Sequence, residues 1–569
     1  MMHWLGKSQQ RMRVVKRIVA LAASAVLWVV LVACGGSVTG GGRGDTARSL
    51  SEQAQFNPQA YDNIRDGGTL TTALPEITPQ FNIWQGDATL VSLMLWRWYN
   101  PILITFTADG DAVFNPDYLT DVKQELVDGN TQVTYTINPK ATYNDGTPID
   151  WRSFEAVWKT SGATNPAYIV HSSDGYDRIT SVSRGVNDRQ AVVTFRGVNL
   201  WWQSLYNNLI HPNAVDLQVF NQGSINTPHP EWGAGPYQIQ NFDQRNGTIT
   251  FVRNPKWWGK PGKLDSRTFV TMEATASINA FKNGQLDATD VATKDRLAQV
   301  QGMTGIDIRK SIEPALSFFT LNGQSPILAD PAVRKAVLEG IDRQQLQKIQ
   351  FQGLNLTAPL PGSMTLLPFQ DGYQDNFTKV ITFNPQQAKQ GLQATGWIPG
   401  PDGIRVKDGK PLEFSYVNLG DDPVDKAVAA ATAAMLHHIG VRLTIRQVPS
   451  NESSAIVTGK RFDMFYSGIT QSDPYGIAYL CQFYCSNTTL IHSGVNNPAL
   501  DAQLRAVNTL PTPQQQYAKA NELETEAFNT YGTMPTISRP AIIAVKHGLA
   551  NYGAGRFFVA TPETIGWQK

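Results

Sequence analysis

The secondary-structure signals change in character near residue 330, and this change limits the folds open to the chain. Before it, glycine and asparagine turn signals separate short alternating runs that are typical of strands. After it, apolar residues recur at helical spacing, and single glycines lead from helices into strands. The expected strands of the first part are 69–74, 133–138, 191–195 and 248–253.

Helices are expected to begin where a capping residue precedes a proline. Asp330 followed by Pro331 is such a start, and Asn384 followed by Pro385 is another. A third helix is expected over 424–438, with a strand from 441 to 445 after Gly440. Helices that alternate with strands in this way predict an α/β lobe.

The N-terminus predicts export. Five cations precede an uncharged apolar run over 18–32, which is shorter than the roughly 20 residues of a membrane-spanning helix. The run ends in Leu-Val-Ala before Cys34, which resembles a bacterial lipobox. We therefore expect 1–33 to be a lipoprotein signal peptide and Cys34 to carry the lipid. The alternative is an ordinary N-terminal membrane anchor with an incidental cysteine.

The segment after Cys34 is rich in glycine and is expected to act as a flexible tether over 34–60. Loss of the signal peptide with its five cations would change the formal net charge from +1 to −4. A mildly acidic protein lacks the basic surface that nucleic-acid binding needs, so no nucleic-acid partner is expected.

The other two cysteines, Cys481 and Cys485, are then expected in an oxidising compartment, where a pair this close can form a disulfide. Free thiols and a metal pair are the alternatives.

Four short segments carry a family resemblance. They are NDGTPIDW at 144–151, GAGPY at 233–237, RNPKWWG at 253–259, and the stretch from Asn322 to Arg343 that contains DPAVRKA and IDR. In this order they resemble the peptide- and nickel-binding (dipeptide- and oligopeptide-binding) family of ABC-transporter substrate-binding lipoproteins. Most of these residues are explained by turns and core packing, so they indicate the fold more than the ligand.

The resemblance implies an α/β, two-lobed fold of the periplasmic-binding-protein type (class II), with an extra subdomain in the first lobe. The expected boundaries are 61–310 for the first lobe, with the subdomain at about 95–205, then 311–536 for the second lobe and 537–569 for a return to the first. Small ligands bind preferentially between such lobes.

The function that follows is capture of di- to oligopeptides for an ABC importer. The partners implied are a permease complex of two membrane subunits with ATPases, and the membrane itself through the lipid. The protein is expected to be a monomer without a cofactor or metal, anchored outside the cytoplasm. Oligosaccharide, metal chelate or another small ligand is the alternative cargo. A secreted hydrolase is a remote alternative, because the sequence lacks the common hydrolase and P-loop motifs.

The candidate ligand residues come from both lobes. In the family, an aspartate after a second-lobe strand holds the peptide's amine, and Asp473 is the residue that matches. Asp473 could equally be a turn residue before Pro474, and Trp84 could equally fill core. The full set of expected ligand residues is Trp84, Gln85, Phe318, Thr320, Asn322, Ile469, Thr470, Gln471, Ser472 and Asp473.

Overall fold

The computed structural model describes residues 54–486, 491, 493–495 and 497–569. The predicted signal peptide, Cys34 and most of the predicted tether lie outside these residues. Within the described part of the chain, no helix has both the length and the apolar character needed to cross a bilayer.

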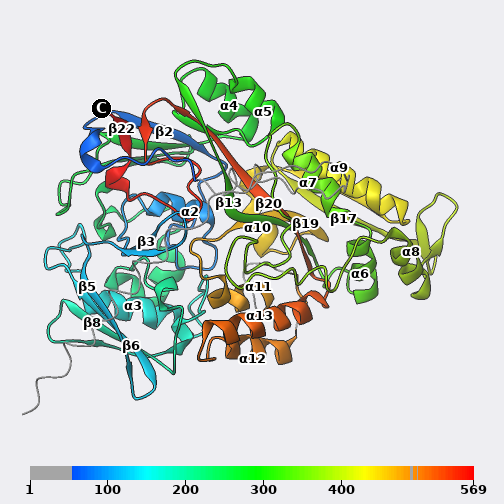
Figure 1. The fold of residues 1–569 in the computed structure, drawn as a ribbon, viewed down its shortest axis with the longest axis horizontal. Coiled ribbons are helices and arrows are strands. Elements are labelled where there is room, and N and C mark those ends of the chain that lie inside the picture. The colour runs from blue at the N-terminus through cyan, green and yellow to red at the C-terminus, as the bar shows by residue number, and fades with distance from the viewer. Residues whose placement is uncertain (1–53, 487–490, 492, 496) are drawn as a thin grey trace, which may run out of the picture. The chain divides into compact units, whose positions relative to one another are not determined.

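A ten-stranded mixed sheet runs through the described residues (Figure 1). Its central strands, β13 and β20, are much longer than their neighbours. Strands β12, β2, β11, β10 and β9 follow on one side, and β19, β17 and β18 follow on the other. The bounds are β2 Thr69–Leu74, β9 Tyr237–Asp243, β10 Thr248–Arg253, β11 Ser266–Thr271, β12 Ala288–Asp290, β13 Ile306–Leu321, β17 Glu413–Leu419, β18 Arg442–Val448, β19 Met464–Thr470 and β20 Thr533–Lys546.

The two long strands connect the two halves of the sheet. They pair antiparallel from Ile306 to Ile312 and again from Leu316 to Thr320, with an interruption between these stretches. Before the interruption β20 also pairs with β12, whereas after it β13 also pairs with β19. Each long strand therefore belongs to the first lobe at one end and to the second lobe at the other.

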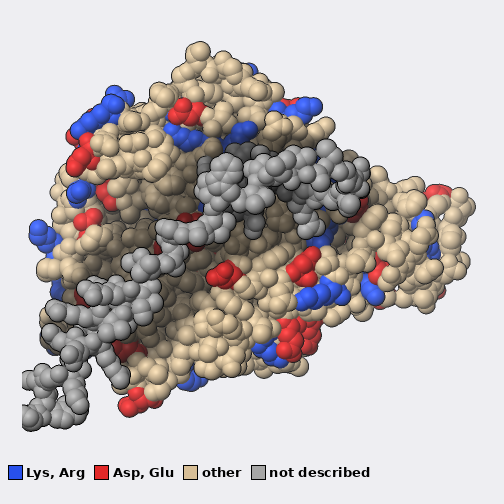
Figure 2. All heavy atoms as spheres, viewed as in Figure 1, with Lys and Arg blue, Asp and Glu red and all other residues tan. Residues whose placement is uncertain are grey.

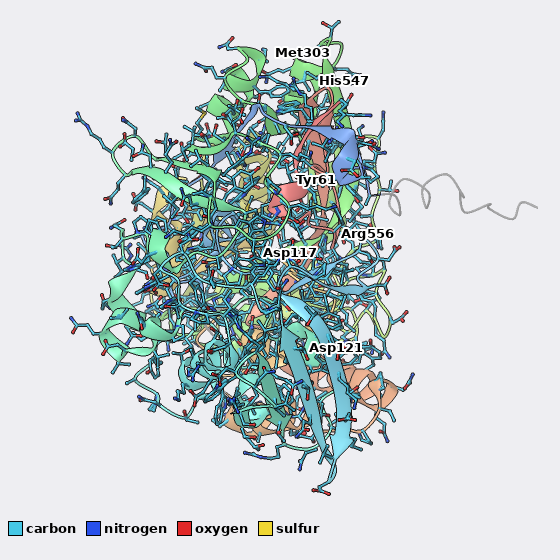
Figure 3. All side chains as sticks on the ribbon, turned by 90° about the vertical axis from the view of Figure 1, so that its left-hand side faces the viewer. Tyr61, Asp117, Asp121, Met303, His547 and Arg556 are labelled. Carbon is cyan, nitrogen blue, oxygen red and sulfur yellow. A yellow bond between two sulfur atoms is a disulfide. The ribbon has the colours of Figure 1, made fainter. Side chains whose placement is uncertain are left out.

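The first lobe also contains a separate four-stranded antiparallel sheet of order β5-β6-β8-β7, covered by helix α3. Figure 3 shows Asp121, on β5, at the opposite end of the view from Met303 and His547, which follow α5 and β20. The bounds are β5 Leu119–Val127, β6 Asn130–Ile137, β7 Ile179–Arg184, β8 Gln190–Phe195, α3 Trp151–Ser161, α4 Ala274–Lys282 and α5 Lys294–Val300.

Helices alternate with strands in the second lobe, as predicted. Asp330 caps α6 by accepting from the backbone N–H of Ala332, and Asn384 caps α8 through Gln387. The third predicted helix and its strand appear as α9 and β18. The bounds are α6 Pro331–Glu339, α7 Arg343–Phe351, α8 Pro385–Ala394, α9 Pro423–His438, α10 Ser453–Thr458, α11 Leu480–Tyr484, α12 Pro498–Val507 and α13 Pro513–Phe528.

The remaining elements are short. Helix α2 follows β2 in the first lobe, and three small sheets have the orders β1-β22-β21, β3-β4 and β14-β15-β16. The bounds are α2 Leu90–Trp96, β1 Ile64–Arg65, β3 Ile104–Phe106, β4 Ala112–Phe114, β14 Ile398–Pro399, β15 Arg405–Lys407, β16 Lys410–Pro411, β21 Leu549–Ala550 and β22 Gly566–Gln568.

The motifs at 144–151, 233–237 and 253–259 meet in the first lobe and stabilise its fold. The Asn254 amide donates to Asn144 Oδ1 and to the Gly235 carbonyl, both at 2.8 Å. A Cβ at Gly235 would lie 3.0 Å from the Tyr99 Cα, so the backbones approach closely there. These three segments therefore supply turns and packing contacts within the first lobe.

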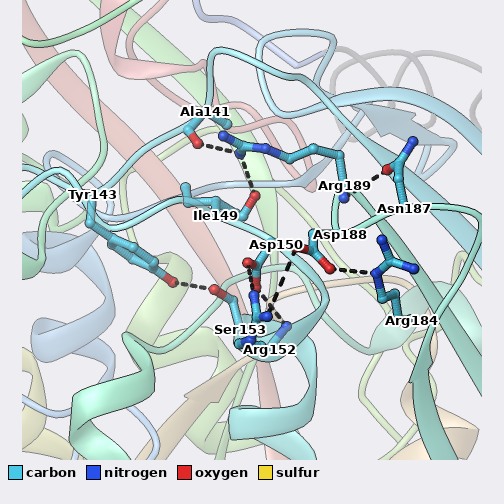
Figure 4. Close-up of polar contacts among 10 residues, drawn as sticks. All are labelled: Ala141, Tyr143, Ile149, Asp150, Arg152, Ser153, Arg184, Asn187, Asp188 and Arg189. Carbon is cyan, nitrogen blue, oxygen red and sulfur yellow. Dashed lines mark hydrogen bonds and ion pairs between the residues drawn. The ribbon is translucent and has the colours of Figure 1, made fainter.

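The end of the first motif starts α3 (Figure 4). Asp150 caps this helix by accepting from the Arg152 backbone N–H at 2.8 Å. The Arg189 guanidinium donates to the carbonyls of Ala141 and Ile149, at 2.6 Å each, and fixes the loop before the helix. On the face seen in Figure 2, acidic and basic side chains lie interspersed.

Candidate functional site

A cavity of about 470 Å³ lies beside the two connecting strands, with walls from both lobes. Pro75 and Glu76, just after β2, form the first-lobe wall. The second-lobe wall comes from β13, β19 and the start of α9. The lining residues used below are Glu76, Phe318, Thr320, Asp425, Phe465, Tyr466, Ile469 and Arg539.

The lobes touch one another around this cavity. Ser450, which lines it, donates from its backbone N–H and its hydroxyl to the Glu273 carboxylate at 3.2 and 3.0 Å. Elsewhere between the lobes, the Tyr479 hydroxyl oxygen lies 3.2 Å from the Ser204 carbonyl oxygen. These contacts join the two lobes on either side of the cavity.

The interruption between β13 and β20 places two opposite charges near one another where the long strands cross. Glu313 lies in the unpaired stretch of β13, and Arg539 lies opposite it in β20. Arg539 reaches the cavity, and its guanidinium passes so close to Gly468 that a Cβ there would lie 2.7 Å from Nη1. Burial lowers the pKa of Arg539, but Glu313 and then Asp425 outweigh it and raise the pKa above its usual value.

Three of the predicted ligand residues line this cavity: Phe318, Thr320 and Ile469. Phe318 and Thr320 share one face of β13, as the alternation of a strand predicts. Ile469 lies opposite Leu316 on the neighbouring strand β19.

Asp473 lies in the loop after β19 and is 1% exposed. Its Oδ1 accepts from the backbone N–H of Tyr475 at 2.8 Å, and its Oδ2 accepts from the Tyr479 hydroxyl. Burial raises the pKa of Asp473 to about 6 despite these hydrogen bonds. The contacts suit a turn residue, and the amine-binding role stays a prediction.

The residues before Asp473 continue away from the cavity. Thr470 pairs with Ala315 in the sheet, and the Gln471 amide donates to the Thr365 carbonyl at 2.8 Å. The Ser472 hydroxyl lies 3.4 Å from Asp473 Oδ2. These contacts connect the Asp473 loop to the sheet and to the segment that contains Thr365.

The other three candidates also lie outside the residues that line the cavity. Trp84 packs edge-to-face on Tyr176, with ring centroids 5.7 Å apart. Gln85 is 1% exposed and accepts from the Asp87 backbone N–H in a tight turn. Asn322 is buried and donates to the Phe462 carbonyl at 2.9 Å. Their proposed contact with a ligand stays a prediction.

Sequence reasoning missed the charged residues of the cavity. Glu76 follows a strand and Pro75, Asp425 reads as an ordinary acid in a first helical turn, and Arg539 lies within a long strand. Burial raises the pKa of Glu76 to about 7. Burial, and then repulsion from Asp422, raises the pKa of Asp425 to about 6.

The predicted disulfide is present in the structure. Cys481 and Cys485 form a disulfide across α11, directly after the Asp473 loop. Among the described residues, no cluster of His, Cys, Asp and Glu has the arrangement of a metal site.

Two lobes joined by long strands, with a cavity between them, define the class of solute-binding proteins. Residues 114–489 match the bacterial extracellular solute-binding proteins, family 5 (Middle). The chain belongs to this family.

Known relatives agree with this assignment. The oligopeptide-binding protein OppA of Mycobacterium tuberculosis (strain H37Rv) is 32% identical over 548 residues, which cover 94% of this chain and 91% of OppA. Among solved structures, the periplasmic EDTA-binding protein EppA aligns with a TM-score of 0.77 at 23% identity, over 91% of this chain and 99% of EppA. The oligopeptide-binding protein AppA of Bacillus subtilis, in complex with a nonapeptide, aligns with a TM-score of 0.75 at 16% identity, over 89% of this chain and all of AppA. The predicted two-lobed α/β fold is therefore confirmed.

Proposed function

We propose that this protein captures peptides outside the cytoplasm and delivers them to the permease of an ABC importer. The main observation in support is the cavity that residues of both lobes line, beside the crossing of β13 and β20. The similarity to OppA over 94% of the chain supports peptides as the cargo. The role is binding without catalysis, as a monomer that serves two membrane subunits and their ATPases.

The structure suggests how capture is coupled to closure. Because β13 and β20 are the long strands shared by both lobes, a change of twist at their interruption would swing one lobe relative to the other. A ligand that contacts both walls stabilises the closed form, and the permease would then recognise the closed protein.

The cargo is tested by isothermal titration calorimetry. The protein is first unfolded to release any bound ligand and is then refolded. We expect a mixed pool of short peptides to bind, and maltooligosaccharides and a nickel–histidine chelate not to bind. Binding of the saccharide or the chelate without the peptides would leave the capture role intact and replace the proposed cargo.

The proposed role of Asp473 as amine anchor is tested by Asp473→Asn. If the carboxylate holds the peptide's ammonium, the affinity falls by about 2–5 kcal/mol, the range for truncating one member of a buried charge pair. An N-acetylated peptide would lose the same affinity against the unchanged protein. Unchanged affinity in the variant would leave Asp473 a turn residue only.

We also propose that the chain is exported and anchored through a lipid on Cys34. Two or more acyl chains suffice for stable attachment. Replacement of Cys34 by Ala should release the protein from the membrane fraction or leave it unprocessed. A Cys34→Ala protein that is still labelled by a fatty-acid probe would contradict the lipid site.

A further inference from the structure

Glu76 carries a buried carboxylate that has no hydrogen-bond or ion-pair partner among the described residues. It lines the interlobe cavity and is 9% exposed. None of the hydrogen bonds or ion pairs found among the described residues involves its side chain. Since an uncompensated charge is costly in such a place, an unpartnered buried carboxylate at the wall of a ligand cavity points to a partner on the ligand.

A second carboxylate reaches the same cavity from the other lobe. Asp425 lies in the first turn of α9, one turn after Asp422, which already caps the helix by accepting from the Val424 N–H at 2.8 Å. Among the described residues, the Asp425 carboxylate makes no hydrogen bond or ion pair. The cap is therefore satisfied without it, and Asp425 is available to the cavity.

The cavity carries an excess of negative charge. Arg539 is the cation among the described residues that line it, and Glu313 is the foremost acid acting on that guanidinium. Asp425 also acts on that guanidinium, but the lining still holds two carboxylates, Glu76 and Asp425, against this one cation. A ligand that brings one positive charge would balance it.

The rest of the wall suits the hydrocarbon part of such a ligand. Phe318, Phe465 and Tyr466 line the cavity together with Ile469. Aromatic faces attract ammonium and guanidinium groups, and apolar walls accept the methylenes that precede them.

We propose that this cavity is a subsite for a cationic group of the ligand, an ammonium or guanidinium, which Glu76 and Asp425 bind from opposite lobes. The proposal rests on the peptide-binding function above and narrows it to peptides that present such a group here. Because the two carboxylates belong to different lobes, the cation also favours closure over the open form.

The test is a competition for the refolded, ligand-free protein. The probe is a pentapeptide pool in which every position carries lysine, norleucine, glutamine or glutamate in equal amounts. Retained peptides are identified by mass spectrometry, with a parallel pool that is N-acetylated. Norleucine keeps the hydrocarbon of lysine without its charge, so the lysine-to-norleucine ratio reports the cation alone.

We expect the retained peptides to be enriched in lysine over norleucine by about tenfold or more, with Glu76→Gln and Asp425→Asn each reducing the ratio at least fivefold. The exposed Glu526→Gln is the matched control and should leave the ratio unchanged. Enrichment that survives N-acetylation assigns the cation to a side chain. A different result assigns the bound cation to the peptide's N-terminus. In that case lysine is not enriched, Glu76→Gln weakens retention, and N-acetylation abolishes it.

Two results would overturn the subsite. Retained peptides with no enrichment, and with the same yield in both variants, would leave the peptide function standing and remove the cation site. Retention of no peptide from either pool would contradict the proposed function as well.

Discussion

Asp473 and Glu76 are both buried carboxylates where the lobes meet, yet their surroundings differ. Asp473 accepts hydrogen bonds from Tyr475 and Tyr479 within its own lobe. Glu76 makes none with the described residues, and burial raises its pKa further, to about 7 against about 6. A buried acid with local donors stabilises the fold, whereas one without them lowers stability until a ligand supplies the missing partner.

The largest effect is expected from Asp473→Ala. It leaves the Tyr475 N–H without its acceptor, at a cost of about 1–3 kcal/mol, and it removes the hydrogen bond from the Tyr479 hydroxyl, which is worth about 1 kcal/mol. The free energy of unfolding should fall by about 2–4 kcal/mol, measured by urea denaturation of the ligand-free protein. A loss below about 0.5 kcal/mol would show that the two carboxylates do not differ in this way.

Removal of the disulfide, which lies in the same part of the chain as Asp473, should lower the free energy of unfolding by a smaller amount. The Cys481–Cys485 bridge closes a short loop next to Tyr479, and the chain-entropy estimate for such a loop is about 2 kcal/mol. The double variant Cys481→Ser, Cys485→Ser should lose about that much in urea denaturation. Alkylation of the exported protein without reduction should label neither thiol, and two labelled cysteines would rule the bridge out.

Glu76→Gln should change stability in the opposite direction. At pH 8 the variant lacks the ionised buried carboxylate, so the ligand-free protein should be more stable by about 1–2 kcal/mol, since one pKa unit corresponds to about 1.4 kcal/mol and water in the cavity screens part of it. A variant that is less stable than the parent at pH 8 would indicate a structural role for Glu76.

The sign of the pH dependence follows from the raised pKa of Glu76. The folded state holds this proton up to about pH 7, whereas the unfolded chain releases it near 4.5, so stability falls as the pH rises between these values. The advantage of Glu76→Gln should therefore be small at pH 4.5 and complete above pH 7. Other acids with raised pKa values remain in both proteins, so the difference between the two curves isolates Glu76.

The elements that local signals define were predictable from the sequence. Asp330 and Asn384 mark helix starts because each caps the backbone a few residues away. The first half of strand β13, which begins at Ile306, had no signal in the sequence, because it pairs with β20, more than 200 residues later in the chain. Pairing over that distance leaves no local pattern.

The charged part of the site was missed for the same reason. Glu76, Asp425 and Arg539 come from three segments far apart in the chain and meet only in the fold. By contrast, Phe318, Thr320 and Ile469 were found through the family resemblance, which locates strands but says little about charge.

Native mass spectrometry of the protein as purified, followed by release and sequencing of any bound compound, tests the cation subsite on the protein's own ligand. We expect a mixture of peptides, each of which carries a free ammonium or a guanidinium group, and loss of most of this mixture from Glu76→Gln. A saccharide, or a compound without any cationic group, in the cavity of the unchanged protein would contradict it.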